Sequence, residues 1–410
     1  MVPCPSFERC GACPWLAEDY ARQLEWKRET VLRAFRSEGL AVPVRPVCGM
    51  DDPFHYRNKV IAAVSMRGSR VVCGLYEEGS HRVVPLSDCR LQDRRINAVL
   101  SDLTGMLNEL KIRPFGYGGT LKHILLRVGV KTGQVMVVLV TSEELMHGRK
   151  ELLARLRKAH PEIVTVVQNV QPRQTSVVLG PRERVLYGQG FILDELLGLR
   201  YKISARSFFQ INSLQTERLY GLALSLAALR PGETLLDAYC GIGTIGLSAA
   251  GAEVQKGPIR TAGAGEMEVE VQKGLIRTGD AAEAEAVKVI GVEINGDAVR
   301  DAVANARANG IRNARFYCAD VSAFMRDFDA GVDVLMLDPP RAGCDMDFLH
   351  SVLRLSPARI VYVSCNPETQ ARDIAFLTRR GRYRIASDAN PVDMFPHTAH
   401  IENVLALARG

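Results

Sequence analysis

Four short apolar segments in the second half of the chain constrain its fold more strongly than any other feature. Each has the length and composition of a buried strand, and helical sequence separates them: TLLDAY (234–239), KVIGVEI (288–294), VDVLMLD (332–338) and RIVYVS (359–364). Strands that alternate with helices in this way form a parallel sheet covered by helices on both faces. The sequence therefore predicts a Rossmann-like, doubly wound α/β domain over residues 196–410.

The residues before this domain have a different pattern. β-Branched segments between residues 45 and 195 are broken by Gly, Asp and Pro, as strands and their turns are. We expect a central, mainly β domain there, with residues 149–160 as its one helix. Residues 1–44 are interpreted as a cysteine-bearing segment followed by a helix.

The composition is that of a soluble globular protein, with 47% apolar and 24% charged residues. The longest apolar-rich segment, residues 219–229, is far shorter than the ~20 residues that a membrane span needs. No secretory signal is visible at the start, so we expect a cytoplasmic protein, and we expect a monomer. The net charge of +6 is compatible with a polyanionic partner without requiring one.

A glycine turn after the first strand predicts a cofactor site. Gly241 and Gly243 follow the strand that contains Asp237, and glycines there let the backbone approach a ligand closely. In nucleotide-binding sheets an acidic residue roughly 20 positions further on binds the ribose hydroxyls. Glu293 lies 56 positions after Asp237, and the 37 residues from 251 to 287 account for all but 19 of them. On this motif alone, NAD stays an alternative ligand.

Residues 251–287 contain a duplicated segment. EVQKGPIRT at 253–261 recurs as EVQKGLIRT at 270–278. Two copies cannot stack into a solenoid core, and long insertions in loops cost little closure entropy. We interpret these residues as a duplicated surface insertion and assign them no function.

Two later strand ends carry side chains that are capable of chemistry. Asp338 is followed by two prolines that rigidify its loop, and Cys365 follows the strand at 359–364. Ligand sites in open α/β sheets lie at the carboxyl ends of strands. On these residues alone, an ordinary turn aspartate and a buried inert thiol are the alternatives.

Five motifs, in their order and over nearly the whole chain, resemble the RNA uracil-C5 methyltransferase family: SARSFFQIN (204–212), DAYCGIGTIG (237–246), LDPPRAG (337–343), VYVSCNPET (361–369) and VDMFPHTAHIE (392–402). The resemblance implies S-adenosyl-L-methionine as the cofactor and a uridine in RNA as the substrate. It implies Cys365 as the nucleophile and Glu402 as the base. It implies a cofactor site made of Gln210, Tyr239, Glu293 and Asp338, with Asp320 as a weaker candidate near the adenine.

The mechanism that the family uses accounts for these residue types. Uracil C5 is a poor nucleophile until a thiolate adds to C6, and a base must afterwards remove the C5 proton. A free thiol is mostly protonated at neutral pH, so we expect the site to lower the pKa of Cys365 or to remove its proton on attack. Glu402 would need a raised pKa. Gln210 has an alternative role, because Asn212 and Gln215 nearby read as a helix capping box.

Cysteines near the N-terminus form a candidate metal site. Cys4, Cys10 and Cys13 lie within ten positions, Cys89 is the candidate fourth ligand, and four thiolates can hold zinc or an iron–sulfur cluster. This motif resembles the ribosomal RNA branch of the family, which implies a [4Fe–4S] cluster and favours 23S rRNA over tRNA as the target. An iron–sulfur redox enzyme and a non-catalytic RNA-binding protein are the alternatives from other classes.

Basic and aromatic residues are interleaved in the central domain, as suits phosphate contacts and stacking on unpaired bases. We expect an RNA-binding surface that includes residues 54–59, Arg82, Arg90, Arg94, Arg95, Lys122, His123 and Arg127. A solvated face of a β domain is the alternative for any one of them.

Overall fold

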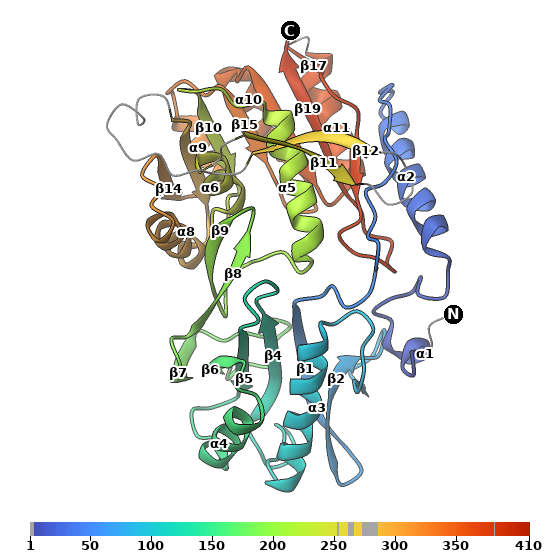
Figure 1. Cartoon of the computed structure of the whole chain (residues 1–410), viewed down its shortest axis with the longest axis vertical. Coiled ribbons are helices and arrows are strands. Elements are labelled where there is room, and N and C mark those ends of the chain that lie inside the picture. The colour runs from blue at the N-terminus through green and yellow to red at the C-terminus, as the bar shows by residue number, and fades with distance from the viewer. Residues whose placement is uncertain (1–3, 252–253, 261–265, 273–285, 381) are drawn as a thin grey trace.

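The computed structural model describes residues 4–251, 254–260, 266–272, 286–380 and 382–410. A large α/β sheet with its helices occupies the upper half of the molecule in Figure 1, and a second, smaller unit built on another sheet lies below it. Among the described residues, no helix combines the length and the apolar character needed to cross a lipid bilayer.

The α/β sheet has the strand order β14-β13-β10-β15-β16-β19-β17, and β18 pairs with β19. The first five strands are parallel, and the other three run antiparallel to their neighbours. The strands are β10 (Thr234–Ala238), β13 (Lys288–Glu293), β14 (Ala314–Cys318), β15 (Val334–Leu337), β16 (Arg359–Ser364), β17 (Tyr383–Ile385), β18 (Asn390–Val392) and β19 (Glu402–Arg409). The predicted α/β class is confirmed.

Helices cover both faces of this sheet: α5 (Ser213–Ala227), α6 (Thr244–Ala250), α8 (Gly296–Ala308), α9 (Val321–Asp327), α10 (Met346–Leu355) and α11 (Pro367–Arg379). Strands buried on both faces read as continuous apolar sequence, and alternate side chains enter two cores. Leu235 and Val361 belong to the core with α5 and α6, whereas Leu236 and Tyr362 belong to the core with α10 and α11.

The lower sheet has the order β3-β2-β1-β4-β5-β6-β7 and is antiparallel except between β5 and β6. Its strands are β1 (Lys59–Arg67), β2 (Arg70–Tyr76), β3 (Val83–Pro85), β4 (Leu121–Val128), β5 (Val135–Thr141), β6 (Ile163–Val170) and β7 (Arg182–Tyr187). The hairpin of β8 (Phe191–Leu196) and β9 (Leu199–Ser204) leads from this sheet to the upper one.

Two helices pack on the lower sheet, so the expectation of one helix there is wrong. The predicted helix is α4 (Arg149–Ala159), and the additional one is α3 (Arg94–Glu109). Its buried residues recur at helical spacing, and the Asp93 side chain accepts a hydrogen bond from the Arg95 amide at the helix start.

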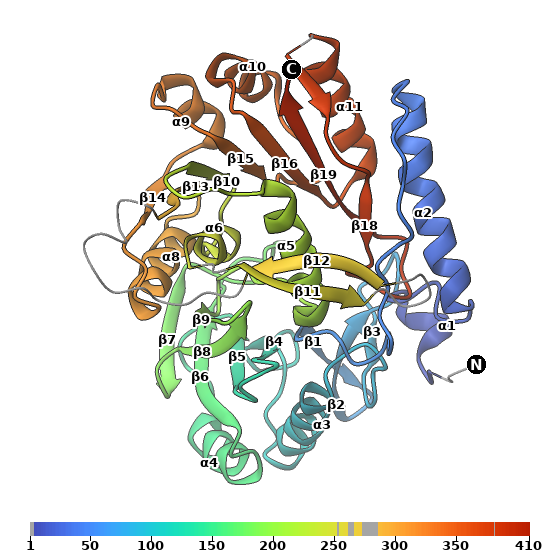
Figure 2. The same ribbon diagram turned by 45° about the horizontal axis from the view of Figure 1, so that its top comes forward.

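The N-terminal segment contains α1 (Phe7–Cys10) and α2 (Tyr20–Ser37), the helix predicted for residues 1–44. α2 lies along α11 and next to β18, so it packs on the upper unit although the lower sheet follows it in the chain (Figure 2). Its Val31, Ala34 and Phe35 side chains enter the same core as Tyr362.

Part of the duplicated insertion forms an antiparallel hairpin of β11 (Val254–Arg260) and β12 (Glu266–Gln272). The hairpin lies against α5, which it crosses in Figure 2. Residues 253, 261 and 273–278 of the two repeat copies lie outside the described residues. The interpretation of 251–287 as an insertion without function stays a prediction.

Candidate active site

A cavity of about 620 Å³ lies where the carboxyl ends of β10, β13, β15 and β16 meet the loop before α5. The strand order reverses between β10 and β15, and such a switch point is where open α/β sheets bind ligands. Six of the predicted site residues line this cavity: Gln210, Tyr239, Glu293, Asp338, Cys365 and Glu402.

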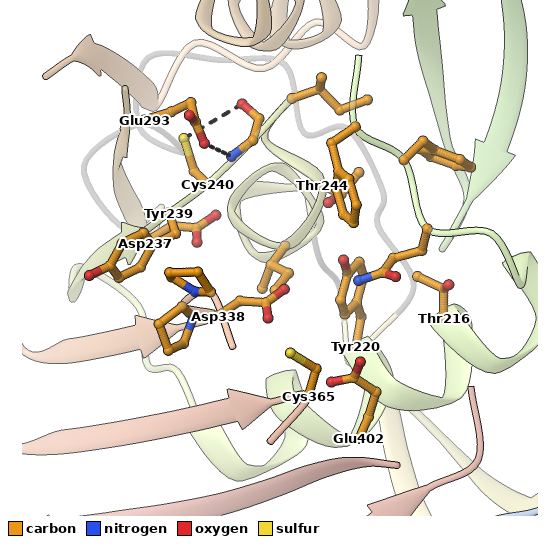
Figure 3. A pocket seen from close by; sticks show the side chains of 18 of the residues that line it. Thr216, Tyr220, Asp237, Tyr239, Cys240, Thr244, Glu293, Asp338, Cys365 and Glu402 are labelled. Atoms are coloured by element: carbon orange, nitrogen blue, oxygen red, sulfur yellow. Dashed lines mark hydrogen bonds between the residues drawn. The ribbon is translucent and has the colours of Figure 1, made fainter. Parts of the chain in front are cut away.

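The register of two strands brings the predicted nucleophile and base together. β16 pairs antiparallel with β19, and Ser364 lies opposite Asn403, so the next position places Cys365 opposite Glu402. Residues opposite each other in an antiparallel pair have their Cβ atoms about 5 Å apart. Figure 3 shows both side chains at the cavity wall, with Asp338 nearby.

The electrostatics of this wall disfavour negative charge. Glu402 is only 3% exposed, and burial together with Asp338 raises its pKa well above the ordinary value. Burial, Glu402 and Asp338 raise the pKa of Cys365 to about 11. Arg341 lowers both pKa values but does not offset the rise. The protein alone therefore does not lower the pKa of the thiol, and its proton has to be removed when it attacks.

Asp338 is held by a rigid loop that is tied to the loop of Cys365. Burial raises the pKa of Asp338 to about 7. Three residues later, the Arg341 carbonyl accepts hydrogen bonds from the side chains of Asn366 at 3.0 Å and Thr369 at 3.3 Å. These contacts fix the two strand-end loops relative to each other.

The glycine turn after β10 orients Glu293. Tyr239 and Gly241 both have left-handed backbone conformations, with φ of 67° and 57°, and a left-handed tyrosine is strained. The Gly241 amide donates to Glu293 Oε2 at 3.2 Å, and the Asn295 amide donates to Oε1 at 2.8 Å. The carboxylate is thereby fixed beside the turn, as Figure 3 shows.

Asp237, which also lines the cavity, has a structural contact that the sequence did not indicate. Its Oδ2 accepts a hydrogen bond from the Gly246 amide in the first turn of α6 at 2.8 Å. Burial raises its pKa to about 7, and Asp338 and Glu293 contribute to the rise. Three neighbouring carboxylates thus repel one another around the cavity.

The loop that carries Gln210 is held by the lower sheet. Buried Arg127 of β4 donates to the carbonyls of Ser204 at 3.0 Å and Ser207 at 2.9 Å, and Asn58 donates to the Gln210 carbonyl at 2.9 Å. Asn212 accepts a hydrogen bond from the Gln215 amide at 3.2 Å and so caps α5. Both interpretations of this loop are therefore correct: Asn212 begins a helix, and Gln210 lines the cavity.

Several of the residues expected on the RNA-binding surface are buried instead. Arg127 holds the cavity loop, Tyr56 donates to the Pro396 carbonyl at 3.0 Å, and Asn58 is 1% exposed. The expectation that these three residues contact RNA is wrong, because they are buried and their polar side-chain atoms form hydrogen bonds within the protein. Arg82 and Arg94 are exposed.

Asp320 is not among the residues that line the cavity. It is exposed, and its Oδ1 accepts a hydrogen bond from the Ala323 amide at 2.9 Å, so it caps α9. Its charge nevertheless contributes to the raised pKa of Tyr239. A role near the adenine stays a prediction.

The lining also includes residues to which the sequence assigns no part in the site, among them Phe208, Tyr220, Arg341 and Phe395, and it includes His400, which the sequence leaves as a positioning or core residue. Phe208 is 62% exposed, which is unusual for a large apolar side chain beside a cavity. Arg341 follows the Asp-Pro-Pro motif directly, so its position next to a strand end was a usable signal. Phe208, Phe395 and His400 belong to the first and last of the five family motifs, which is a signal of the same kind, whereas Tyr220 on α5 has none.

Three of the four N-terminal candidate ligands, Cys4, Cys13 and Cys89, belong to one small cluster with Leu16, Met50, Tyr56 and Leu91, and Cys10 lies within electrostatic reach of Cys4 and Cys89. Burial and the neighbouring cysteines raise the thiol pKa of Cys10, and they raise that of Cys13 to about 12. Four thiols suit an iron–sulfur cluster or zinc as donors. However, no group of three or more Cys, His, Asp or Glu side chains that could hold a metal ion is found in the described part of the chain. The predicted metal site is not confirmed.

Known proteins resemble the chain over nearly its full length. The family described as tRNA (uracil-5-)-methyltransferase matches residues 19–410. An RNA methyltransferase of Halalkalibacterium halodurans is 40% identical over 414 residues, which cover 99% of this chain and 83% of the relative. One of Bacillus cereus is 35% identical over 417 residues, with coverages of 100% and 83%.

A solved structure with the same arrangement is the tRNA (uracil-54, C5)-methyltransferase of Pyrococcus abyssi in complex with S-adenosyl-L-homocysteine. Its TM-score is 0.73 at 27% identity, over 97% of this chain and 86% of that one. The family match and the identity of the relatives cover both the cavity and the strand ends that line it. This chain belongs to the tRNA (uracil-5-)-methyltransferase family of RNA methyltransferases.

Proposed function

We propose that this protein transfers a methyl group from S-adenosyl-L-methionine to C5 of a uridine in RNA. The observation that carries the proposal is the pairing of Cys365 with Glu402 at one wall of the cavity, within the electrostatic reach of Asp338. A thiol beside a proton acceptor suits addition to uracil C6 and the later removal of a proton from C5.

The proposed mechanism assigns one role to each of these two side chains. Cys365 gives its proton to solvent and forms a bond from Sγ to C6, which breaks the C5–C6 double bond and leaves negative charge on C5 and O4. The cofactor, when bound, supplies a methyl group from a sulfonium cation to C5. Glu402 then accepts the C5 proton, the double bond forms again, and the Cys365 thiolate leaves C6.

For the cofactor we propose a site made of Gln210, Tyr239, Glu293 and Asp338, with Asp320 at its edge. Burial raises the pKa values of Asp237, Asp338 and Glu402, and neighbouring carboxyl groups add to the rise at Asp237 and Glu402; a bound cation would offset both effects. A sulfonium cofactor fits this acidic wall better than NAD does, because S-adenosyl-L-methionine has a net positive charge, whereas NAD would bring the negative charges of its pyrophosphate beside these carboxyl groups. The Pyrococcus abyssi structure, with its bound S-adenosyl-L-homocysteine, supports the same choice.

We propose 23S rRNA as the target, because the N-terminal cysteine motif resembles that of the ribosomal RNA branch. The second candidate is tRNA, the substrate named for the Pyrococcus abyssi relative. Mapping 5-methyluridine in 23S rRNA and tRNA from cells with and without the protein separates the two. If 5-methyluridine is lost from tRNA alone, the target is tRNA and not 23S rRNA. If 5-methyluridine is lost from neither RNA, the methyltransferase proposal is refuted.

We further propose that Cys4, Cys10, Cys13 and Cys89 hold a [4Fe–4S] cluster. The shared apolar cluster of Cys4, Cys13 and Cys89, with Cys10 in electrostatic reach, supports this, and the four thiols would have to approach one another more closely to bind the iron–sulfur cluster. Protein purified without oxygen should contain iron and absorb broadly in the visible range. Cys89→Ser should lose the iron, whereas Cys318→Ser, at an exposed site, should keep it. Stoichiometric zinc without iron would refute this assignment.

A further inference from the structure

The loop of residues 393–401 connects β18 with β19 and ends directly before Glu402. Its residues Phe395 and His400 line the cavity. A buried ion pair fixes the start of this loop. Lys27 Nζ of α2 lies 2.5 Å from Asp393 Oδ1, and both side chains are completely buried.

The ion pair is part of a larger group of contacts with α2. Lys27 also donates to the Phe395 carbonyl at 3.1 Å, and the Tyr20 hydroxyl donates to Asp393 Oδ2 at 2.9 Å. Asp393 Oδ1 in turn accepts a hydrogen bond from the Phe395 amide at 3.2 Å. The lysine and the aspartate therefore hold the backbone of the loop as well as each other.

A second set of contacts holds the middle of the same loop. The His397 amide donates to the Gln23 side chain at 3.0 Å, and its carbonyl accepts from the Trp15 amide at 3.1 Å. Between these contacts His397 has a left-handed backbone, with φ of 66°, which costs energy for a residue other than glycine. The N-terminal segment thus holds the loop in a conformation that it would not favour by itself.

The ion pair lies close to Glu402 through the sheet. Val392 of β18 is the register partner of Glu402, and Asp393 is the next residue. Burying a lysine and an aspartate costs desolvation energy that an apolar pair of similar size would avoid. Stability alone therefore gives no reason for charges at this place, whereas a fixed geometry next to the proposed base does.

We propose that Lys27 and Asp393 are positioning residues that place Glu402 for the removal of the C5 proton. The inference rests on the proposed function, because it assigns these residues to one step of that reaction. It makes a specific prediction: loss of the ion pair slows proton removal and leaves the addition of Cys365 and the methyl transfer largely intact.

Lys27→Met tests this with two RNA substrates. On uridine-containing RNA we expect turnover to fall at least about tenfold, while a methylated covalent RNA–protein complex accumulates. A tenfold fall corresponds to an activation free energy of the proton-removal step that is about 1.4 kcal/mol higher. On RNA that contains 5-fluorouridine, which has no C5 proton to remove, the complex should form at the wild-type rate. Equal loss of complex formation on both RNAs would overturn the inference and show a merely structural role.

A matched control is Arg359→Met. Arg359 also pairs with a carboxylate, that of Glu233, and donates to a carbonyl, that of Ala227 at 2.8 Å, but it lies at the start of β16, the opposite end of that strand from Cys365. This variant should lose stability without accumulating the methylated complex. If Lys27→Met does not fold, Tyr20→Phe removes one contact of Asp393 and should accumulate the complex to a smaller extent. If the wild-type protein forms no covalent complex with the RNA that contains 5-fluorouridine, the proposed function itself is refuted.

Discussion

The thiol of Cys365 is a poor nucleophile in the protein alone, because burial and two neighbouring carboxyl groups disfavour its ionised form. Burial and two carboxylates raise its pKa to about 11, so at neutral pH nearly all of it is protonated. A positive charge held a few ångströms away would act in the opposite direction. Binding of a cationic methyl donor would therefore both supply the methyl group and make the thiol easier to ionise.

The alkylation rate of Cys365 tests this effect of the cofactor. An opposite charge within about 4–6 Å shifts a pKa by about one unit or more, so S-adenosyl-L-methionine should raise the rate of iodoacetamide modification at pH 8 about tenfold. Peptide mass spectrometry measures the rate, with the exposed Cys318 as the internal control. S-Adenosyl-L-homocysteine lacks the sulfonium charge and should have a smaller effect. A rate that both ligands lower equally would contradict the expectation and indicate shielding.

Asp338 should make the stability of the protein depend on pH in a defined direction. Its pKa is about 7 in the folded protein and about 4 in an unfolded chain, so the folded state binds more protons between these values. Stability therefore falls as the pH rises through this window. Asp338→Asn removes the effect, and without cofactor it should melt on the order of 2 °C above wild type at pH 8.

The same variant should show no such gain at pH 4, where the wild-type carboxyl is protonated as well. Thermal unfolding of both proteins over this pH range measures the difference. The asparagine should still abolish most methyl transfer, because it cannot offset the charge of a cationic cofactor. A lower melting temperature than wild type at pH 8 would contradict the assigned direction of the pKa shift.

The sequence could predict which residues lie at strand ends, but not which of them face each other. Cys365 and Asp338 follow apolar segments that only a buried strand explains. The pairing with Glu402 depends on the register of an antiparallel strand, and that register is fixed by tertiary contacts such as those of Asp393. The pKa of Cys365 is raised mainly by burial and then by Glu402 and Asp338, so the direction of this shift also depends on tertiary structure that the sequence does not show.

Among the elements, local patterns were reliable and their packing was not. The sequence of α4 predicts a helix. The buried residues of α3 have an equally clear helical spacing, but the β-branched segments on both sides of α3 conceal it. The position of α2 against α11 and β18 joins segments more than 300 residues apart, and nothing in its own sequence indicates it. Its buried Lys27 would be read from sequence as an exposed charge.

Replacement of residues 251–287 by a short glycine–serine linker tests the interpretation of the insertion. The residues lie between the end of α6 and the start of β13, and shortening a loop changes closure entropy by only about 1 kcal/mol. We expect a folded protein whose rate of methyl transfer is within about twofold of wild type. A twofold change in rate corresponds to less than about 1 kcal/mol of activation free energy. Thermal unfolding and a methyl-transfer assay measure both, and an unfolded or inactive product would contradict the interpretation.

In the whole molecule, the cavity depends on both sheets. The upper sheet supplies the strand ends, and Arg127 and Asn58 of the lower unit hold the loop that carries Phe208 and Gln210. RNA that reaches the cavity would therefore meet a rim built from both units. The sequence indicates the two units but not this joint rim, because nothing in it shows that Arg127 is buried against the loop rather than exposed to RNA.

Phe208 is the side chain on this rim that is best suited to stack on an unpaired base. It is 62% exposed and lines the cavity. Stacking of a base on an aromatic ring contributes about 1–3 kcal/mol, so Phe208→Ala should raise the KM for RNA about tenfold and leave cofactor binding unchanged. Leu214→Ala, a substitution of an exposed apolar residue outside the lining, is the matched control. Equal KM values for the two variants would contradict this role.

The most direct test of the proposed chemistry is the covalent complex with RNA that contains 5-fluorouridine in place of uridine. In the presence of S-adenosyl-L-methionine, we expect a complex that survives denaturation, and peptide mass spectrometry should place one nucleotide carrying one added methyl group on Cys365. Cys365→Ala should form neither this complex nor 5-methyluridine in ordinary RNA. Formation of 5-methyluridine by Cys365→Ala at the wild-type rate, or a complex through another residue, would contradict the assignment of Cys365 as the nucleophile.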